Sequence, residues 1–480
     1  MSFYDVVIIG AGVVGAAIAR ELSRYRLNVA ILEKNEELAF GVSKSNSGII
    51  HPGTQNPVNS LKGRLCLEGN VLMRKLSREL GVDFKEVGEL IIAFNREEAI
   101  RLSELKKEAE ALGVRRLQIV DQKWLRINEP NLNTDAFAAL YAPSAGIISP
   151  YRLTYDLCEN AVQNGVKIFT KSEIRTIVKT NEHFEIFHTP YTTIRAKFVI
   201  NAAGLYADDV AGMVGIHDIK ITPRKGEEFI LDKKREHIAN HLLFPLPSKI
   251  SKGILVIKTA DGNPMIGPTA EDVLDKEDLA TTDTGLQKAL LGAQKMIPSI
   301  SERDIIAYFA GLRPVAGDDF IIRYEEKVPG FVNVAGIQSP GLTAAPAIAL
   351  MVVNILRKRG LTMKKKIFFR AKQKELTHLF SIPFSLTQKL VKRNASFGDM
   401  VCRCELVSSK EVRDAINKGA TTMDGIKFRT RAQSGRCHGS FCTTRIMRIL
   451  AEERKIPLVK ITKRGVGSEI VVEDKSDENT

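Results

Sequence analysis

Apolar residues in the first 357 positions follow two patterns. Compact apolar runs, typical of strands buried in a parallel sheet, occur at 5–10, 28–34, 197–204 and 330–336. Segments with the helical period of 3.6 residues, such as 95–113, lie between these runs. Strands that alternate with helices in this way predict an α/β domain built on a mainly parallel sheet.

A second group of segments is typical of antiparallel strands. Residues 88–94, 227–232 and 252–260 alternate more strongly between apolar and polar positions. We interpret them as parts of a substrate domain, about residues 80–150 and 220–315, inserted between pieces of a nucleotide-binding domain. Together the two domains are expected to occupy residues 1–360.

The first predicted strand leads into a glycine-rich motif. Gly10, Gly12 and Gly15 have the G-x-G-x-x-G spacing at the start of a helix. Glycine there allows a tight turn, close approach of a pyrophosphate and close packing of the helix on the sheet, while the helix N-terminus favours negative charge. Glu33 ends the second strand, where a carboxylate can bind ribose hydroxyls. The motif predicts a dinucleotide site without distinguishing FAD from NAD, and a purely structural turn is the alternative.

The C-terminal quarter differs from the rest of the chain in charge. The protein has a net charge of +14, and residues 358–394 hold eleven Lys or Arg against one Glu, while residues 402–455 hold twelve Lys or Arg against six Asp or Glu. We interpret 361–399 as a basic connector, 400–455 as a small separate domain and 456–480 as a frayed polar tail. The region lacks a base-stacking aromatic pattern and a groove-binding motif, so we expect no nucleic-acid partner.

Four of the six cysteines lie in the small domain. Cys402 and Cys404 are followed after thirty-two residues by Cys437 and Cys442. Such clustering in a chain without an export signal indicates metal binding in a reducing compartment. The spacing does not fit the paired C-x2-C knuckles of zinc ribbons well, and four thiolates can instead hold a [2Fe–2S] cluster. A zinc-stabilised structural domain is the alternative.

Hydropathy argues against a membrane span. No stretch reaches about 18 uninterrupted apolar residues, and the apolar N-terminus begins after Asp5 without the basic residues of a signal peptide. We expect a cytoplasmic protein, and attachment to the membrane periphery through a partner subunit stays open.

Several segments resemble, in order, the D-amino-acid-oxidase-type flavoprotein superfamily. These are the N-terminal motif, 45–53 (SNSGIIHPG), 199–215, 311–320 and 332–349. The resemblance implies an α/β FAD-binding (Rossmann-like) domain with an inserted antiparallel-sheet substrate domain, and FAD as a cofactor. The residues expected at FAD are Gly10, Gly12, Val13, Val14, Gly15, Glu33, Lys34, Ser45, Asn46, Ser47, Gly48, Ala203, Gly204, Gly336, Gly341, Leu342 and Thr343.

Residues 402–442 resemble the bacterioferritin-associated-ferredoxin-like [2Fe–2S] domain, at all four cysteines and in an arginine-rich stretch. The resemblance implies a small helical domain with a [2Fe–2S] cluster on Cys402, Cys404, Cys437 and Cys442. Four arginines, which are Arg403, Arg429, Arg431 and Arg436, are then expected near the negative cluster, where positive charge favours the reduced state. A flavin takes two electrons at once and the cluster passes them singly, which favours a dehydrogenase that feeds an electron-acceptor protein or companion subunits.

The combined arrangement resembles the large subunit of anaerobic glycerol-3-phosphate dehydrogenase, which implies oxidation of glycerol 3-phosphate to dihydroxyacetone phosphate. Residues 240–270 also resemble L-2-hydroxyglutarate dehydrogenases. Ile337-Gln338-Ser339 stands where the glycerol-phosphate family usually has Gly-Gly-Lys, so a 2-hydroxy acid stays an alternative substrate. An amino-acid dehydrogenase of the same superfamily and a nicotinamide-only dehydrogenase are further alternatives.

Oxidation of a secondary alcohol needs a base for the hydroxyl proton. His51 is the leading candidate, because the resemblance places its segment beside the flavin and imidazole titrates near neutrality. Arg313 can bind a carboxylate or phosphate through its planar donor fork, or pair with a nearby aspartate instead. Lys225 and Glu227 are second-rank pocket candidates, because a strand would point both to the same face.

Overall fold

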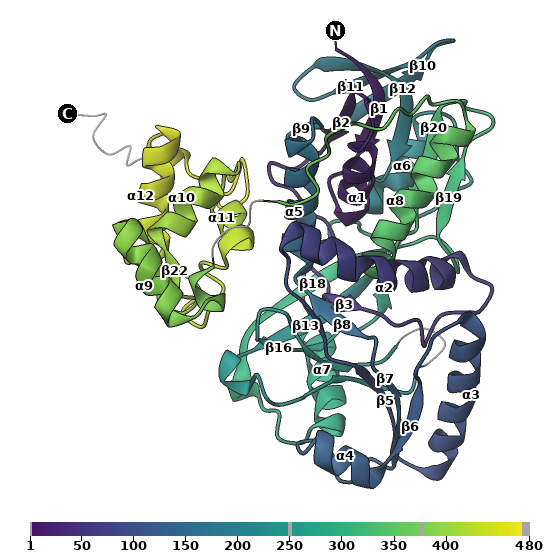
Figure 1. Ribbon diagram of the computed structural model, residues 1–480, viewed down its shortest axis with the longest axis vertical. Coiled ribbons are helices and arrows are strands. Elements are labelled where there is room, and N and C mark those ends of the chain that lie inside the picture. The colour runs from purple at the N-terminus through teal and green to yellow at the C-terminus, as the bar shows by residue number, and fades with distance from the viewer. Residues whose placement is uncertain (1, 248–251, 374–377, 473–480) are drawn as a thin grey trace. The chain divides into compact units, whose positions relative to one another are not determined.

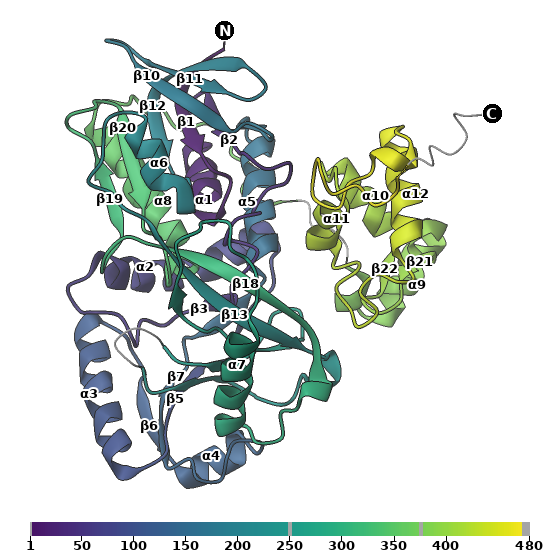
Figure 2. The same cartoon turned by 180° about the vertical axis from the view of Figure 1, so that it is seen from behind.

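The computed structural model describes residues 2–247, 252–373 and 378–472, which fall into two compact units (Figure 1 and, from behind, Figure 2). The first unit holds Met1–Leu32, Ala39–Phe169 and Glu173–Gln373. The second holds Lys374–Thr480 together with the short stretches Glu33–Leu38 and Thr170–Ser172.

The N-terminal sheet of the first unit is built around β1 (Phe3–Ile9), whose residues 6–9 are all apolar and buried. Parallel partners lie on both sides of it: β2 (Val29–Leu32), β12 (Thr192–Asn201), β9 (Lys167–Phe169) and β20 (Phe331–Ala335). The eight-stranded sheet is completed by antiparallel strands, β10 (Ile174–Lys179), β11 (Phe184–His188) and β19 (Ile321–Tyr324). Strands buried on both faces explain the compact apolar runs in the sequence.

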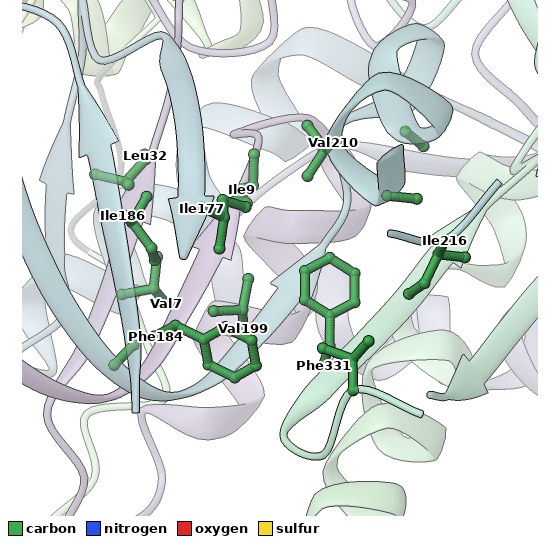
Figure 3. Packing of buried hydrophobic residues seen from close by; sticks show 14 of the residues in the cluster. Val7, Ile9, Leu32, Ile177, Phe184, Ile186, Val199, Val210, Ile216 and Phe331 are labelled. Atoms are coloured by element: carbon green, nitrogen blue, oxygen red, sulfur yellow. The ribbon is translucent and has the colours of Figure 1, made fainter. Parts of the chain in front are cut away.

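One core cluster of this domain joins the sheet to α6 (Ala207–Gly212), as Figure 3 shows. Val7, Ile186 and Val199 come from three neighbouring strands, and Val210 comes from the helix. The rings of Phe184 and Phe331 lie 6.1 Å apart between their centroids. Side chains from segments far apart in the sequence therefore share one apolar interior.

Helix packing places the flavin-type segments. α8 (Gly341–Lys358) packs against α1 (Val13–Leu22) and α2 (Leu61–Leu80), and α5 (Pro150–Gln163) packs against α1. Among the described residues α8 alone is long and apolar enough to cross a membrane, and 56% of its apolar window is buried inside the protein. Its composition is explained by this burial.

The second sheet of this unit has nine strands and lies in the region expected to form the substrate domain. Its strands are β5 (Glu89–Ala93), β6 (Gln118–Asp121), β7 (Ala138–Ala142), β13 (Thr222–Leu231), β14 (Leu242–Pro245), β15 (Leu255–Lys258), β16 (Pro264–Gly267), β17 (Glu271–Asp272) and β18 (Ile305–Val315). All pairs are antiparallel except β14 with β5, so the sheet differs in this one pair from the expected antiparallel pattern.

Two apolar clusters cover the two faces of the nine-stranded sheet. One includes side chains of α4 (Gln122–Asn128) and α7 (Asp283–Met296), and the other includes side chains of α3 (Arg96–Leu112). The α3 face also receives Ile49 from β3 (Ile49–Ile50), which forms a small sheet with β8 (Gly146–Ile148) and β4 (Phe84–Glu86). This face therefore meets the segment that holds His51.

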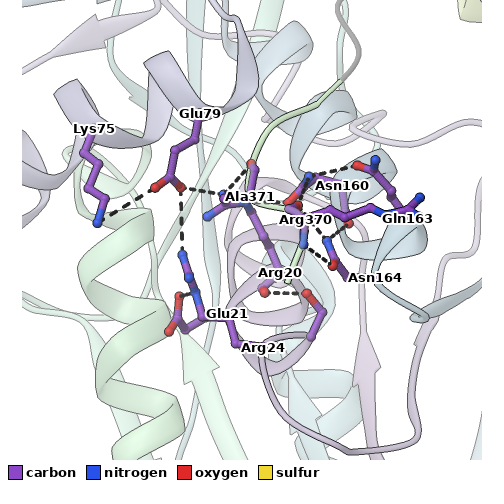
Figure 4. Close-up of polar contacts among 11 residues, drawn as sticks. Arg20, Glu21, Arg24, Lys75, Glu79, Asn160, Gln163, Asn164, Arg370 and Ala371 are labelled. Carbon is purple, nitrogen blue, oxygen red and sulfur yellow. Dashed lines mark hydrogen bonds and ion pairs between the residues drawn. The ribbon is translucent and has the colours of Figure 1, made fainter. Parts of the chain in front are cut away.

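The first part of the expected connector belongs to the first unit (Figure 4). Arg20 of α1 donates through Nε to Asn160 Oδ1 at 2.9 Å and through Nη2 to Ala371 O at 3.2 Å. The side-chain amides of Asn160 and Asn164 both donate to Arg370 O at 3.0 Å. Residues up to 373 are thus fixed against α1 and α5, whereas 374–377 lie outside the described residues.

The second unit is helical, with α9 (Phe384–Arg393), α10 (Ser409–Asn417), α11 (Met423–Thr430) and α12 (Thr443–Arg454) around a hairpin of β21 (Met400–Cys402) and β22 (Val407–Ser408). Ser408 and Glu411 form a capping box at the start of α10. After α12 the chain returns to the start of α11, where Met423 N and Asp424 N donate to Thr462 O and Lys463 O at 3.1 and 2.8 Å. The frayed tail therefore does not begin at 456, and its last part, 473–480, lies outside the described residues.

Candidate active site and cluster site

The glycine-rich turn leaves room for a dinucleotide. Gly10 has φ +102°, and a Cβ there would lie 2.5 Å from Ala202 O, while a Cβ on Gly15 would collide with Gly10 O. Gly12 is the N-cap of α1 and has no side chain of its own to cap the helix. Val13 N donates to Ser43 Oγ at 2.9 Å, which brings the segment before 45–53 to the same turn. A helix start with glycine at its N-cap, which permits close approach to the backbone, fits a pyrophosphate.

The acidic residue expected at the ribose is held in position. Glu33 directly follows β2 and is 7% exposed. Asn35 donates to its Oε1 through the backbone N–H at 2.9 Å and through Nδ2 at 2.8 Å. Lys34, by contrast, has an exposed side chain. A fixed carboxylate at this point fits the hydroxyls of an adenosine ribose.

Hydrogen bonds join the two segments that were expected beside the flavin ring. Gly48 has φ +68° and its N–H donates to Asn46 Oδ1 at 3.0 Å, which shapes the turn before His51. His51 N donates to Thr343 Oγ1 at 2.9 Å, and this hydroxyl donates to Ile49 O at 3.3 Å. Thr343 belongs to the first turn of α8, directly after Gly341 and Leu342. The structure thus places 46–51 at the start of α8.

The other two expected contacts with FAD are turns. Gly336 has φ +67° and follows β20, and Gly204 has φ +60° and follows β12. Ala203 N donates to Asn201 Oδ1 at 3.3 Å. Both turns lie at the carboxyl ends of parallel strands, where ligands of open α/β sheets bind.

His51 is nearly buried, with 9% of its surface exposed, and it has two different sides. Its Nδ1 lies 3.8 Å from Glu89 Oε2 and 3.5 Å from Lys252 Nζ. Its Nε2 lies 3.4 Å from Ser339 Oγ. Burial first, and then the Lys252 charge, lower the pKa of His51 to about 4 against the opposing effect of Glu89. At neutral pH the ring is therefore uncharged and can accept a proton.

Arg313 lies on the face of the nine-stranded sheet that meets the segment with His51. Its Nη2 donates to Thr269 O at 2.5 Å and its Nε to Arg224 O at 3.4 Å. Burial lowers the pKa of Arg313, and the nearby Glu228 opposes this shift. Among the described residues Arg313 forms no ion pair with Asp318 or Asp319, and Asp319 instead accepts from Leu61 N and Lys62 N at the start of α2. The guanidinium is therefore held by carbonyl groups, and no hydrogen bond from its Nη1 occurs among the described residues.

Lys225 and Glu227 do share one face of β13, but that face lies away from Arg313. Lys225 Nζ donates to Asp278 Oδ2 at 2.9 Å, and Glu227 accepts from Thr282 N and Oγ1 at the start of α7. The face with Arg313 instead carries Glu228, whose Oε1 accepts from Ser47 Oγ at 2.8 Å. Because side chains of a strand alternate, a shift of one residue exchanges the two faces.

The four clustered cysteines form two pairs. Cys404 Sγ lies 3.5 Å from Cys437 Sγ, and hydrogen bonding from Cys442 lowers the pKa of Cys402 to about 6. Among residues 2–247, 252–373 and 378–472, no three His, Cys, Asp or Glu side chains converge on a point that could hold one metal ion. Two pairs fit a [2Fe–2S] cluster, in which each iron takes two thiolates, better than one tetrahedral zinc.

The backbone around these pairs is suited to thiolates. N–H groups of Gly439 and Phe441 hydrogen-bond to Cys437, and the side chain of Cys404 lies where a Cβ on Gly435 would stand. Such N–H donors stabilise the charge of a cluster. Of the four arginines expected nearby, Arg431 donates to Glu405 Oε2 at 2.8 Å and Arg429 is buried, whereas Arg403 and Arg436 are exposed.

Comparisons with known proteins agree with this geometry. Residues 5–355 match the family described as FAD dependent oxidoreductase, and residues 400–452 match the BFD-like [2Fe-2S] binding domain. The chain belongs to the FAD-dependent oxidoreductase family. The match confirms the expected fold class, the enzyme class and both cofactors, FAD and a [2Fe–2S] cluster.

Three relatives of this FAD-dependent oxidoreductase are informative. It is 41% identical to a glycerol 3-phosphate dehydrogenase of Caloramator mitchellensis over 98% of both chains. It is 28% identical to the human mitochondrial L-2-hydroxyglutarate dehydrogenase over 75% of this chain and 89% of the other. The dithionite-reduced L-α-glycerophosphate oxidase of Mycoplasma pneumoniae with FAD bound matches with a TM-score of 0.74 and 32% identity, over 78% of this chain and 99% of that one.

Sequence reasoning missed several residues of this FAD-dependent oxidoreductase. Glu89, Glu228 and Lys252 lie close to His51 or Arg313, yet none of them belongs to a recognisable motif. Glu89 is the first residue of a strand, a position where a charged residue is usually solvated. Ser339 entered the sequence analysis only as one of the residues that replace the usual Gly-Gly-Lys element. The signal that could have identified these residues was a charged residue within a run of apolar residues.

Proposed function

We propose that this FAD-dependent oxidoreductase oxidises glycerol 3-phosphate to dihydroxyacetone phosphate and is a dehydrogenase rather than an oxidase. The cationic surroundings of His51 carry the proposal. Lys252 lies 3.5 Å from its Nδ1, and the charges of Arg313 and Lys62 act on Lys252. A phosphate monoester with nearly two negative charges suits such a site.

Lys252 can take the place of the lysine in the Gly-Gly-Lys element that is missing before α8. Its side chain comes from the loop before β15 and is half-buried beside His51. Burial lowers the pKa of Lys252, so an anionic substrate favours its protonated form. A lysine supplied from a different segment therefore restores the cation that phosphate recognition needs. This favours a phosphate over the 2-hydroxy acid of the second candidate, L-2-hydroxyglutarate.

The chain's own groups have distinct tasks in this reaction. When bound, FAD supplies the hydride acceptor and the [2Fe–2S] cluster supplies one-electron transfer to an external acceptor. His51 accepts the hydroxyl proton through Nε2, Arg313 and Lys252 bind the phosphate, and Ser339 orients the ring at Nε2. An uncharged imidazole is the form that can act as this base.

The extent of the matches supports a dehydrogenase. The dehydrogenase relative spans 98% of this chain, whereas the Mycoplasma oxidase is covered to 99% by only 78% of it. The match to the dehydrogenase therefore extends into the cysteine domain at 400–452, whereas about a fifth of this chain has no counterpart in the oxidase. Cys404 is exposed and Cys437 partly so, which gives a protein acceptor or companion subunit access to one edge of the cluster. We infer that the enzyme works in the reducing cytoplasm, where cysteines are kept as thiols that can bind a cluster.

Anaerobic mixing of the purified holoenzyme with candidate substrates tests the proposal. Glycerol 3-phosphate should bleach the flavin absorbance, yield dihydroxyacetone phosphate and reduce the cluster, as seen by electron paramagnetic resonance. L-2-hydroxyglutarate and proline are the comparison substrates. Rapid bleaching by either of them, with none by glycerol 3-phosphate, would overturn the proposal.

A further inference from the structure

A carboxylate, that of Glu89, is buried inside the nine-stranded sheet beside His51, the proposed base. Glu89 begins β5, pairs with Ala142 of β7 and Leu242 of β14, and is 0% exposed. A carboxylate in such a place is costly unless other groups compensate its charge. The groups around Glu89 therefore decide how its charge is stabilised.

The two oxygens of Glu89 have different surroundings. Oε1 accepts a hydrogen bond from the hydroxyl of Thr54. Oε2 has no hydrogen-bond partner among the described residues, and it lies 3.8 Å from His51 Nδ1. This distance is too long for a hydrogen bond, but such contacts in catalytic sites often shorten when substrate binds. Oε2 is thus an acceptor aimed at a ring nitrogen.

The position of the imidazole proton decides whether His51 can act. Nε2 faces Ser339 at 3.4 Å, directly before α8, which is the side of the expected flavin. Nε2 accepts a proton only if Nδ1 carries the ring hydrogen. A carboxylate at Nδ1 favours this tautomer, whereas an ammonium donor at Nδ1 favours the opposite one.

Both kinds of group are present at Nδ1. Lys252 Nζ lies 3.5 Å from it and competes with Glu89. The charges of Lys62 and Arg313 act on Lys252, whereas Lys252 and Glu89 are the charged groups that shift the pKa of His51. Cys66, whose Sγ lies 3.6 Å from His51 O, stays a neutral thiol because burial raises its pKa to about 12. On the remaining side the ring of Phe244 lies 6.2 Å away and carries no charge.

We propose that Glu89, oriented by Thr54, is a positioning residue that keeps the His51 proton on Nδ1 and so makes Nε2 the base. The inference rests on the proposed function only for the identity of the proton that Nε2 removes. An anionic substrate strengthens the arrangement, because it attracts Lys252 and leaves Nδ1 to Glu89.

The first test is independent of substrate identity. The holoenzyme is labelled with nitrogen-15 in its eight histidines, and the His51 signals are assigned from the His51→Asn variant. At neutral pH, Nδ1 should have the chemical shift of a protonated ring nitrogen and Nε2 that of an unprotonated one. The Nε2-protonated tautomer in the wild type would overturn the proposal without any substitution.

Two substitutions should have opposite effects on the pKa of His51. Glu89→Gln removes a negative neighbour and should lower the pKa of His51 and move protons towards Nε2. Lys252→Met removes a positive neighbour and should raise that pKa, with the Nδ1-protonated form kept. A merely structural Glu89 would change thermal stability but leave the tautomer as it is, and that result would also overturn the proposal.

The second test measures flavin reduction by glycerol 3-phosphate in a single turnover. Glu89→Gln should slow reduction by about 10- to 100-fold with little change in substrate Kd. Glu89→Asp should recover part of the rate, and Thr54→Val should give an intermediate loss. If glycerol 3-phosphate reduces no variant and not the wild type, the proposed function fails while the tautomer result still stands. Reduction of Glu89→Gln at the wild-type rate would refute the role of Glu89.

Discussion

Glu228 should make the stability of this enzyme depend on pH in a direction that is unusual for a carboxylate. The side chain is buried and accepts a hydrogen bond from Ser47 Oγ at 2.8 Å. Burial raises the pKa of Glu228 from 4.5 to about 7, although Ser47 and Arg313 both oppose the shift. The folded protein therefore binds a proton here that the unfolded chain has already released between these two pH values.

The sign and size follow from this difference. Above the folded pKa the native state must keep a buried carboxylate, so folding stability falls as pH rises from about 4.5 to about 7. At about 1.4 kcal/mol per pKa unit, the total effect is about 3 kcal/mol, of which about 2.5 kcal/mol falls between pH 5 and pH 9. In a unit of about 360 residues, whose unfolding entropy is about 0.8 kcal/mol/K, that corresponds to about 3 °C in Tm.

Thermal unfolding of the wild type and Glu228→Gln between pH 5 and pH 9 measures this effect. The variant cannot ionise, so its Tm should gain on the wild type as pH rises, and other titrating groups cancel in the difference. Ser47→Ala removes a hydrogen bond that favours the carboxylate, so it should raise the pKa of Glu228 and shift the pH window upward. Parallel Tm curves for the wild type and Glu228→Gln would refute the reasoning.

Three further predictions concern the other parts of the molecule. Gly69→Ala should lower Tm and FAD retention, because a Cβ there collides with Thr343 O, whereas Gly212→Ala meets only His217 at 3.8 Å and should change neither. Elemental analysis should find two irons per chain in the wild type, and zinc in place of iron would contradict the cluster. Cys404→Ser should lose this iron, while Cys158→Ser, at a buried cysteine of α5, should keep it. Lys364→Gln with Lys365→Gln should weaken turnover with an acidic ferredoxin and flatten its salt dependence without changing flavin reduction, with Lys389→Gln and Lys392→Gln of α9 as the comparison. Lys366 is left unchanged in that test because its Nζ donates to Asn164 O, and equal salt slopes for both variants would argue against docking at 364–365.

Local patterns predicted the parts of the fold whose chemistry is local. The turn after β1 needs glycine at Gly10 and Gly15 for steric reasons that hold wherever the rest of the chain lies. The four cysteines lie within about forty residues, so their spacing alone limits what they can bind. In both cases the residues that act together are also close together along the chain.

The pocket could not be predicted in the same way. Alternation along β13 identifies two faces, but only tertiary packing decides that Glu228 faces Ser47 and that Glu227 faces Thr282. The connector shows the same limit. Its composition indicates a solvated basic segment, yet the amides of Asn160 and Asn164 fix the carbonyl group of Arg370 against α5. Neither contact leaves a signal in the local sequence.

Thr343 shows why packing far from the reacting atoms matters for this enzyme. Its hydroxyl accepts the N–H of His51 and donates to Ile49 O, while its backbone carbonyl lies against Gly69 of α2. The same residue therefore fixes the base segment, the start of α8 and the distance between two core helices. Because these contacts share one residue, a displacement of α2 also moves His51 relative to Glu89 and Ser339. The position of the proposed base thus depends on the packing of α2 against α8 as much as on its polar neighbours.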